Sequence, residues 1–298
     1  MSAFVLLLVC MLLGVGAARF AQPPIGLAQA INWWVINLAL PALILELIPT
    51  LHFDPHLWLL IVSQWLVFAG AFLLFRVLGR RQGWSDGRIG ALTLVCGLGN
   101  TSFMGYPMIA ALRGQDGLAL AVVADQLGCF IMLALGGVIV AVIYGGATAH
   151  PREIARRVLL FPAFLALLAG VVAGHLGGWP EIANDILHRI GQTLTPLALF
   201  SVGLRLRLHL TRDQIAPAAL GLSWKLLLAP LLVFALGSVT GAGGLLLTIA
   251  VLQAGMAPMI SAAILADQYR LEPPLANTVL GFGILLSLLT VPLANRLL

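Results

Sequence analysis

Hydrogen-bonding side chains gather within one otherwise apolar stretch of the chain. Residues 97–107 read GLGNTSFMGYP, which places Asn100, Thr101 and Ser102 among three glycines and ahead of Pro107. Proline lacks an N–H group and clashes with the preceding helical turn, and glycine adds an entropic cost to a helix. The pattern therefore predicts a helix that is interrupted here. Asn100 either caps the broken helix or donates its amide to a carboxylate, and the two hydroxyls either bind the same solute or return hydrogen bonds to freed backbone carbonyls.

A weaker copy of this pattern occurs late in the chain. Residues 256–262, MAPMISA, match residues 105–111, GYPMIAA, at four positions, and Gln253 precedes Pro258. Both prolines suit the first turn of a helix that restarts after a break. A helix N-terminus carries about half a positive charge, so two such ends directed at one cavity would favour an anion there. We therefore expect one substrate site that includes Asn100, Thr101, Ser102, Pro107, Gln253 and Pro258.

Two charged residues lie deep within other apolar runs. Asp125 is about eight residues into its run, which at about 1.5 Å per residue puts it on the order of 12 Å deep. Lys225 is at a similar depth from the opposite end of another run. Charges at such depth are costly and usually paired. Either the two residues form a structural ion pair, or Asp125 is a proton or cation coupling site with Lys225 as its partner or as an attractor of anions.

The composition identifies the solvent that surrounds these elements. Hydrophobic residues make up 61% of the 298 residues and charged residues only 9%, whereas soluble domains carry about 25% charged residues. At about 20 residues per crossing, the length accommodates about ten transmembrane helices. We expect them near 2–18, 25–50, 56–78, 88–112, 116–145, 157–177, 182–205, 214–237, 242–267 and 273–297. The first is interpreted as a helix rather than a signal peptide, because nothing before Arg19 is charged.

The arginines indicate how these helices cross the membrane. With ten spans, twelve arginines fall on one side and three, Arg113, Arg189 and Arg296, on the other. Cytoplasmic loops collect Lys and Arg, so the first side is the cytoplasm and both termini are external. The expected location is the inner (plasma) membrane. The two interrupted helices are the fourth of each set of five, which predicts two repeats, residues 1–149 and 150–298, with the second inverted relative to the first.

The sequence lacks the residue patterns that other classes of function require. No metal-ligand spacing, nucleophile elbow, phosphate-binding loop or paired catalytic carboxylates occur in the sequence, so we expect neither an enzyme nor a cofactor. Cys10, Cys96 and Cys129 lie in apolar runs and are interpreted as small buried hydrophobic residues. The net charge of +5 reflects membrane topology rather than nucleic-acid binding. Expected partners are a small carboxylate, the lipid bilayer and, as one option, a second copy of the chain.

These segments resemble the auxin efflux carrier family, which includes plant auxin exporters and bacterial permeases for malonate and related acids. Residues 99–107 resemble its Gly-Asn-Thr crossover, and residues 161–162, 225–230 and 256–258 resemble its sixth, eighth and ninth helices. The likeness runs from end to end. It implies an all-α membrane protein of ten helices in two inverted repeats with broken crossover helices four and nine, carboxylate transport, and Gln126 as a substrate contact. Gln253 stands where a counterpart of Asn100 is expected.

The preferred function is that of a secondary transporter which moves small organic anions, carboxylates above all, by alternating access. The closest rival is a cation/proton antiporter or a sodium-coupled symporter of related inverted-repeat fold. A single deep carboxylate beside two anion-favouring helix ends argues against that rival. An intramembrane enzyme would need paired acids, a nucleophile with its base, or a metal cluster, and the sequence offers only Asp125 and Lys225 at such depth.

Overall fold

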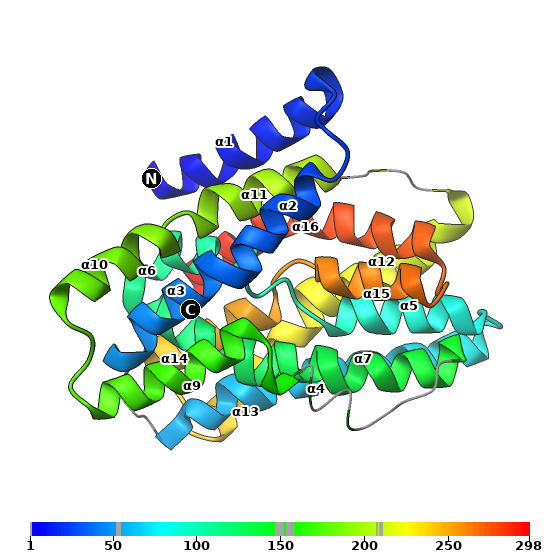
Figure 1. Ribbon diagram of the computed structural model, residues 1–298. Coiled ribbons are helices and arrows are strands. Elements are labelled where there is room, and N and C mark those ends of the chain that lie inside the picture. Colours follow the sequence, from blue (N-terminus) through cyan, green and yellow to red (C-terminus); the bar gives the residue numbers. More distant parts are fainter. Residues whose placement is uncertain are drawn as a thin grey trace. The chain divides into compact units, whose positions relative to one another are not determined.

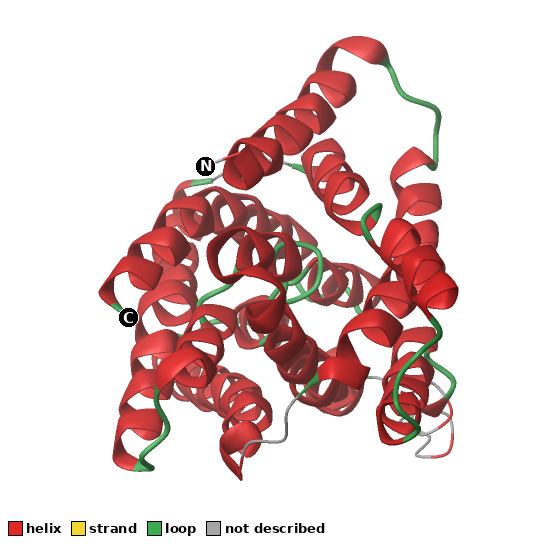
Figure 2. Cartoon of the chain, turned by 90° about the vertical axis from the view of Figure 1, so that its left-hand side faces the viewer, coloured by secondary structure: helices red, strands yellow, loops and turns green. Residues whose placement is uncertain are grey.

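The computed structural model describes residues 2–51, 55–146, 152, 156, 158–206, 208 and 211–298. Every named element in these ranges is a helix (Figure 2), which confirms the predicted all-α class. Five helical segments are long and apolar enough to cross a membrane, and they are Leu27–Thr50, Pro55–Arg81, Gly105–Gly145, Arg212–Val239 and Pro273–Leu297.

The chain divides into two compact units that interleave along the sequence. The first comprises Met1–Asp54, Ser102–Val122 and Arg156–Leu206, and the second comprises Pro55–Thr101, Val123–Ala155 and Arg207–Leu298. Neither unit coincides with a predicted half of the chain. Each unit draws segments from both halves, so the compact units are not the sequence repeats.

Small residues bring the helices of the first unit close together. Its elements are α1 (Ser2–Gly16), η1 (Ala17–Ala21), α2 (Leu27–Trp34), η2 (Val35–Ala39), α3 (Leu40–Leu47), η3 (Ile48–Thr50), the first part of α6 (Gly105–Val123), α9 (Pro162–His175), α10 (Glu181–Gly191) and α11 (Leu194–Arg205). A Cβ on Gly14 of α1 would lie 2.2 Å from the Phe200 carbonyl oxygen, and one on Gly203 of α11 would lie 2.2 Å from the Met11 carbonyl oxygen. Such close backbone approach is typical of helix pairs in membranes.

The second unit holds most of the predicted site. Its elements are η4 (Pro55–Leu57), α4 (Trp58–Arg81), α5 (Asp86–Gly97), η5 (Ala124–Cys129), α7 (Phe130–Gly145), η6 (Arg212–Gln214), α12 (Ile215–Ser223), η7 (Trp224–Leu228), α13 (Ala229–Val239), α14 (Gly244–Ala254), α15 (Ile260–Gln268) and α16 (Pro273–Leu297). In Figure 1, α15 (orange) lies beside α5 (cyan), with α7 (green) close by. Every residue of α5 from Ile89 to Gly97 is buried, so this part of the helix is covered on all sides.

Wide π-helical turns interrupt three of the long helices. In η2 and η7, the wide turn ends just before a proline, Pro41 and Pro230 respectively. A proline ring cannot sit against the carbonyl of the residue four positions earlier, so the helix widens ahead of it. The third wide turn, η5, has no proline after it and contains Asp125 and Gln126. Single π-helical turns are frequent at functional sites, and here two of the three carry the deep polar residues.

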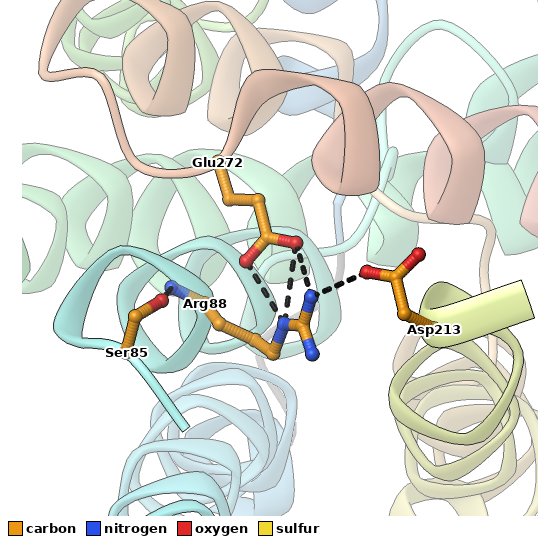
Figure 3. A network of polar contacts seen from close by, with 4 residues as sticks. All are labelled: Ser85, Arg88, Asp213 and Glu272. Carbon is orange, nitrogen blue, oxygen red and sulfur yellow. Dashed lines mark hydrogen bonds and ion pairs between the residues drawn. The ribbon is translucent and has the colours of Figure 1, made fainter. Parts of the chain in front are cut away.

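An ion-pair network anchors the start of α5 (Figure 3). Arg88 donates from Nε and Nη2 to the Glu272 carboxylate at 2.9 and 2.8 Å, and from Nη2 to Asp213 at 3.0 Å. Ser85 caps the same helix, since its hydroxyl accepts from the Arg88 backbone N–H at 3.2 Å. Glu272 precedes α16 with a φ of 41°, a left-handed conformation. The network therefore ties α5 to the segments that lead into α12 and α16.

Candidate functional site

Two interrupted helices meet at their breaks, where backbone hydrogen bonds join them. α5 ends at Gly97 and α14 ends at Ala254. Past these ends, Leu98 and Met259 are extended, and Gly99 and Pro258 form an antiparallel bridge. The Asn100 N–H donates to the Ala257 carbonyl at 2.7 Å, and the Met259 N–H donates to the Leu98 carbonyl at 3.1 Å. The predicted breaks therefore exist at both places, and each break satisfies backbone groups of the other.

The two prolines occupy different positions relative to the helices that follow. Pro107 is the third residue of α6, in the first turn, as predicted. The prediction for Pro258 is wrong, because α15 begins only at Ile260 and Pro258 lies in the extended bridge. A proline suits that position because its missing N–H is not needed by the bonds from Asn100 and Met259. Its ring packs on α16, where a Cβ on Gly283 would lie 2.2 Å from Pro258 Cδ.

The side chains at the break form a buried polar cluster around Asp125. The Thr101 hydroxyl donates to Asp125 Oδ1, and Gln126 Nε2 donates to Asp125 Oδ2 at 2.7 Å. Gln253 Nε2 donates to the Thr101 carbonyl at 3.3 Å. All four residues are at most 2% exposed. The structure therefore brings together four of the predicted site residues from α14, η5 and the break after α5.

Nδ2 of Asn100, a donor, and Oε1 of Gln126, an acceptor, are both buried in this region, and neither has a hydrogen-bond partner within the described part of the chain. A buried polar atom that lacks a partner costs about 1–3 kcal/mol, so such atoms are rare in proteins without a reason. A donor left open beside the break is what recognition of a carboxylate or another acceptor requires. The Nδ2 donor of Asn100 therefore does not bond a free carbonyl at the end of α5.

Lys225 contacts backbone. Its ammonium donates to the Ala254 carbonyl at 2.9 Å and forms no salt bridge with a carboxylate anywhere in the described ranges. The direct ion pair with Asp125, one of the two alternatives from the sequence, is therefore not seen among the described residues. The carboxylate oxygens of Asp125 accept from Thr101 and Gln126, while the ammonium is directed at the end of α14.

Ser102 and Pro107 belong to the first unit and are described within it. The Ser102 carbonyl accepts from the Tyr106 N–H at 3.2 Å, which starts the winding of α6. Ser102 is only partly buried, whereas Pro107 is buried. Further along α6, Gly114 has a φ of 68° and interrupts the helix. This position falls between the two apolar runs predicted to end at 112 and to begin at 116.

Cys129 is a member of the cluster that sequence analysis missed. Its Sγ donates to the Gly99 carbonyl at 3.2 Å, and the side chain is buried. In the sequence, Cys129 looks like one more small apolar residue. Its spacing could have indicated membership of the cluster, because Cys129 follows Asp125 by four positions and therefore shares a helical face with it. No group of three or more His, Cys, Asp or Glu residues that could hold a metal ion occurs within the described residues.

Comparison with known proteins places this geometry in context. A family described as membrane transport protein matches residues 1–294. An uncharacterized transporter of Methanothermobacter thermautotrophicus is 30% identical over 268 residues, covering 89% of this chain and 87% of that protein. A putative malonate transporter of Rhizobium meliloti is 28% identical over 295 residues, covering 94% and 89%. A probable auxin efflux carrier component 9 of Oryza sativa is 28% identical over 134 residues, covering 43% and 31%.

Proposed function

The chain belongs to the membrane transport protein family, the auxin efflux carrier family that the sequence resembled, and on this premise we propose that it moves small organic anions by alternating access. The family is one of membrane transport proteins, and the relatives above are named as transporters. The chain is therefore a multi-pass membrane transporter rather than an enzyme. The proposed substrates are carboxylates. The name of the Rhizobium relative, a putative malonate transporter, supports that class.

One observation carries the substrate proposal. Asn100 presents a buried amide donor without a partner at the point where two helices break. A hydrogen bond from such a donor to a charged acceptor contributes about 1.5–3 kcal/mol. Asp125 is the one carboxylate in the cluster, and its oxygens accept from Thr101 and Gln126. An incoming carboxylate would therefore meet the open donor of Asn100 rather than an arginine clamp.

The proposed topology has ten crossings in two inverted repeats. Four of the long apolar segments each correspond to one proposed crossing. The fifth segment, Gly105–Gly145, bends at Gly114 and holds the end of the fourth crossing and the whole of the fifth. The shorter apolar helices Val5–Ala21, Pro162–His175 and Gly244–Ala254 lie in the first, sixth and ninth crossings. The start of each half, residues 1–54 and 156–206, lies in the first compact unit, and residues 55–101 and 207–298 lie in the second, whereas residues 102–122 belong to the first unit without a counterpart from the second half. That division supports a repeat of 1–149 and 150–298. The arginine distribution supports an inner-membrane protein with external termini.

The coupling proposal concerns Asp125. Its burial at 2% exposure favours a group that binds a proton or a cation during the cycle. The same observation favours the alternative function, a cation/proton antiporter or a sodium-coupled symporter. Ser102 and Pro107 remain proposed substrate-site residues, and the support for them is the sequence pattern of residues 97–107.

Flux through purified protein in sealed vesicles tests these proposals. We expect uptake of radiolabelled malonate, succinate or a monocarboxylate above that of protein-free vesicles, and none of an organic cation or a neutral sugar. Uptake should be measured with no gradient, with a pH gradient and with a sodium gradient. In the Asp125→Asn variant, pH-driven uptake should be lost while exchange persists. Exchange of sodium for protons, or sodium-driven uptake of a solute other than a carboxylate, with no carboxylate carried, would establish the alternative function instead.

A further inference from the structure

Lys225 is the one lysine of the chain, and its environment is unusual for an ammonium group. The side chain is 0% exposed and lies in the wide turn η7. It forms no salt bridge with a carboxylate within the described residues, and it donates a hydrogen bond to a backbone carbonyl. A buried charge is costly unless something compensates it. The compensation must therefore come from backbone dipoles.

The ammonium lies at the carboxyl ends of both interrupted helices. Its acceptor, the carbonyl of Ala254, belongs to the last residue of α14 and is 2.9 Å from Nζ. Gly99 follows the last residue of α5 by two positions, and a Cβ there would lie only 2.9 Å from Nζ. The last carbonyls of a helix lack partners in the helix and carry about half a negative charge. Two such ends together amount to about one negative charge, which one ammonium balances.

We propose that Lys225 is a tethered counter-ion that neutralises the carboxyl ends of α5 and α14 and so holds the two breaks together. It is a positioning residue, because it acts through the backbone around Gly99 and Ala254 rather than by contact with a substrate. A protein without this ammonium would need a bound cation at the same place. The inference does not depend on which solute is transported.

The close approach at Gly99 supports this role over that of an incidental buried lysine. Any side chain at Gly99 would displace the ammonium, so the bare backbone leaves the space that the ammonium fills. The Gly99 carbonyl is itself held by the Cys129 thiol at 3.2 Å. Lys225 and Cys129 thus both lie against Gly99, from η7 and η5, the two wide turns that carry the deep polar residues.

Removal of the ammonium should create a dependence on added cations. We expect Lys225→Ala to melt at a lower temperature than the wild type in detergent, and to regain several degrees with ethylammonium chloride in a saturable manner. Choline chloride at equal ionic strength, too large for the vacated space, should have no such effect. The matched control is Leu226→Ala, which removes a neighbouring buried side chain without a charge. It should be destabilised but unresponsive to ethylammonium, as should the wild type.

The proposal is overturned if Lys225→Ala responds to ethylammonium no more than Leu226→Ala does. Should Lys225→Ala fail to fold, Lys225→Arg and Lys225→Met decide the question. The methionine matches lysine in shape but lacks its charge, and hydrophobic replacement of a charge that only fills space is often tolerated. A higher yield and melting temperature for the arginine variant supports the counter-ion. A methionine variant at least as stable as the arginine variant refutes it.

Discussion

The backbone N–H of Asn100 donates to the carbonyl of Ala257 at 2.7 Å, although 157 positions separate the two residues. This bond joins the break after α5 to the break after α14, so the main chain of Asn100 is committed to the fold. The side-chain nitrogen Nδ2 has no hydrogen-bond partner within the described residues. A substitution of Asn100 can therefore remove this donor and keep the backbone hydrogen bond.

Asn100→Ala should weaken carboxylate binding and leave the fold intact. The variant keeps the backbone bond to Ala257 and removes a donor that bonds to nothing else in the described chain. We expect a loss of about 1.5–3 kcal/mol in binding, the range for a hydrogen bond to a charged group. Calorimetry with a carboxylate panel measures it, with melting temperature as the check on folding. The matched control is Asn277→Ala, whose amide donates to Pro273 in α16. Equal affinity of wild type and Asn100→Ala would place the site elsewhere.

The breaks were predictable because glycine and proline act locally. The interruption after Gly97 and the position of Pro107 follow from those residue types, whatever surrounds them. The direction of a long side chain is not local. Lys225 was expected near Asp125 because the sequence indicates that both residues lie at a similar depth in the membrane. Depth does not determine the direction in which each side chain points around its helix axis. The wide turn η7 changes that direction, and no residue pattern fixes its effect beyond the presence of Pro230.

The packing of α1 on α11 predicts opposite results for two glycines of the same helix. A Cβ on Gly14 would lie 2.2 Å from the Phe200 carbonyl oxygen, whereas a Cβ on Gly16 would have nothing within 4 Å. Gly14→Ala should therefore cost about 1–3 kcal/mol, as overpacking does. Gly16→Ala should be neutral or stabilise by up to about 1 kcal/mol through helix propensity. Thermal unfolding in detergent measures both, and similar melting temperatures for the two variants would contradict this packing.

The ion pairs at the start of α5 should differ in importance. Arg88 binds Glu272 through two nitrogens, and both side chains are about four-fifths buried, at 19% and 21% exposure. Arg80 pairs with Asp86 at 60% and 50% exposure. Arg88→Ala leaves Glu272 without these bonds and should cost about 1.5–3 kcal/mol. Arg80→Ala, the control, should cost about 1 kcal/mol or less, as exposed pairs do. Equal losses would mean that the Arg88 network contributes no more than a surface pair.

The arginine count predicts which loops an external reagent can reach. In a background with Cys10, Cys96 and Cys129 replaced by alanine, Arg81→Cys should be protected from an impermeant maleimide in intact cells. Gln115→Cys, next to the kink of α6 at Gly114, should be labelled. Both positions are exposed in the structure, so burial does not explain a difference. Permeabilised cells, in which both should react, are the control. Labelling of position 81 alone in intact cells would reverse the proposed orientation.

The polar cluster predicts which partners of Asp125 are energetically coupled to it. The Thr101 hydroxyl donates directly to the carboxylate, whereas the Lys225 ammonium bonds the Ala254 carbonyl instead. A double-mutant cycle of Thr101→Val with Asp125→Asn should give a coupling of about 0.5–3 kcal/mol in unfolding free energy, the range for residues in one hydrogen-bond network. The cycle of Lys225→Met with Asp125→Asn should give a smaller value, because no bond between the two side chains is lost. Thr101→Ser, which keeps the hydroxyl, is the control for the first cycle. A larger coupling to Lys225 than to Thr101 would show that the ammonium and the carboxylate meet after all, and Lys225 would then return to the role of direct partner of Asp125.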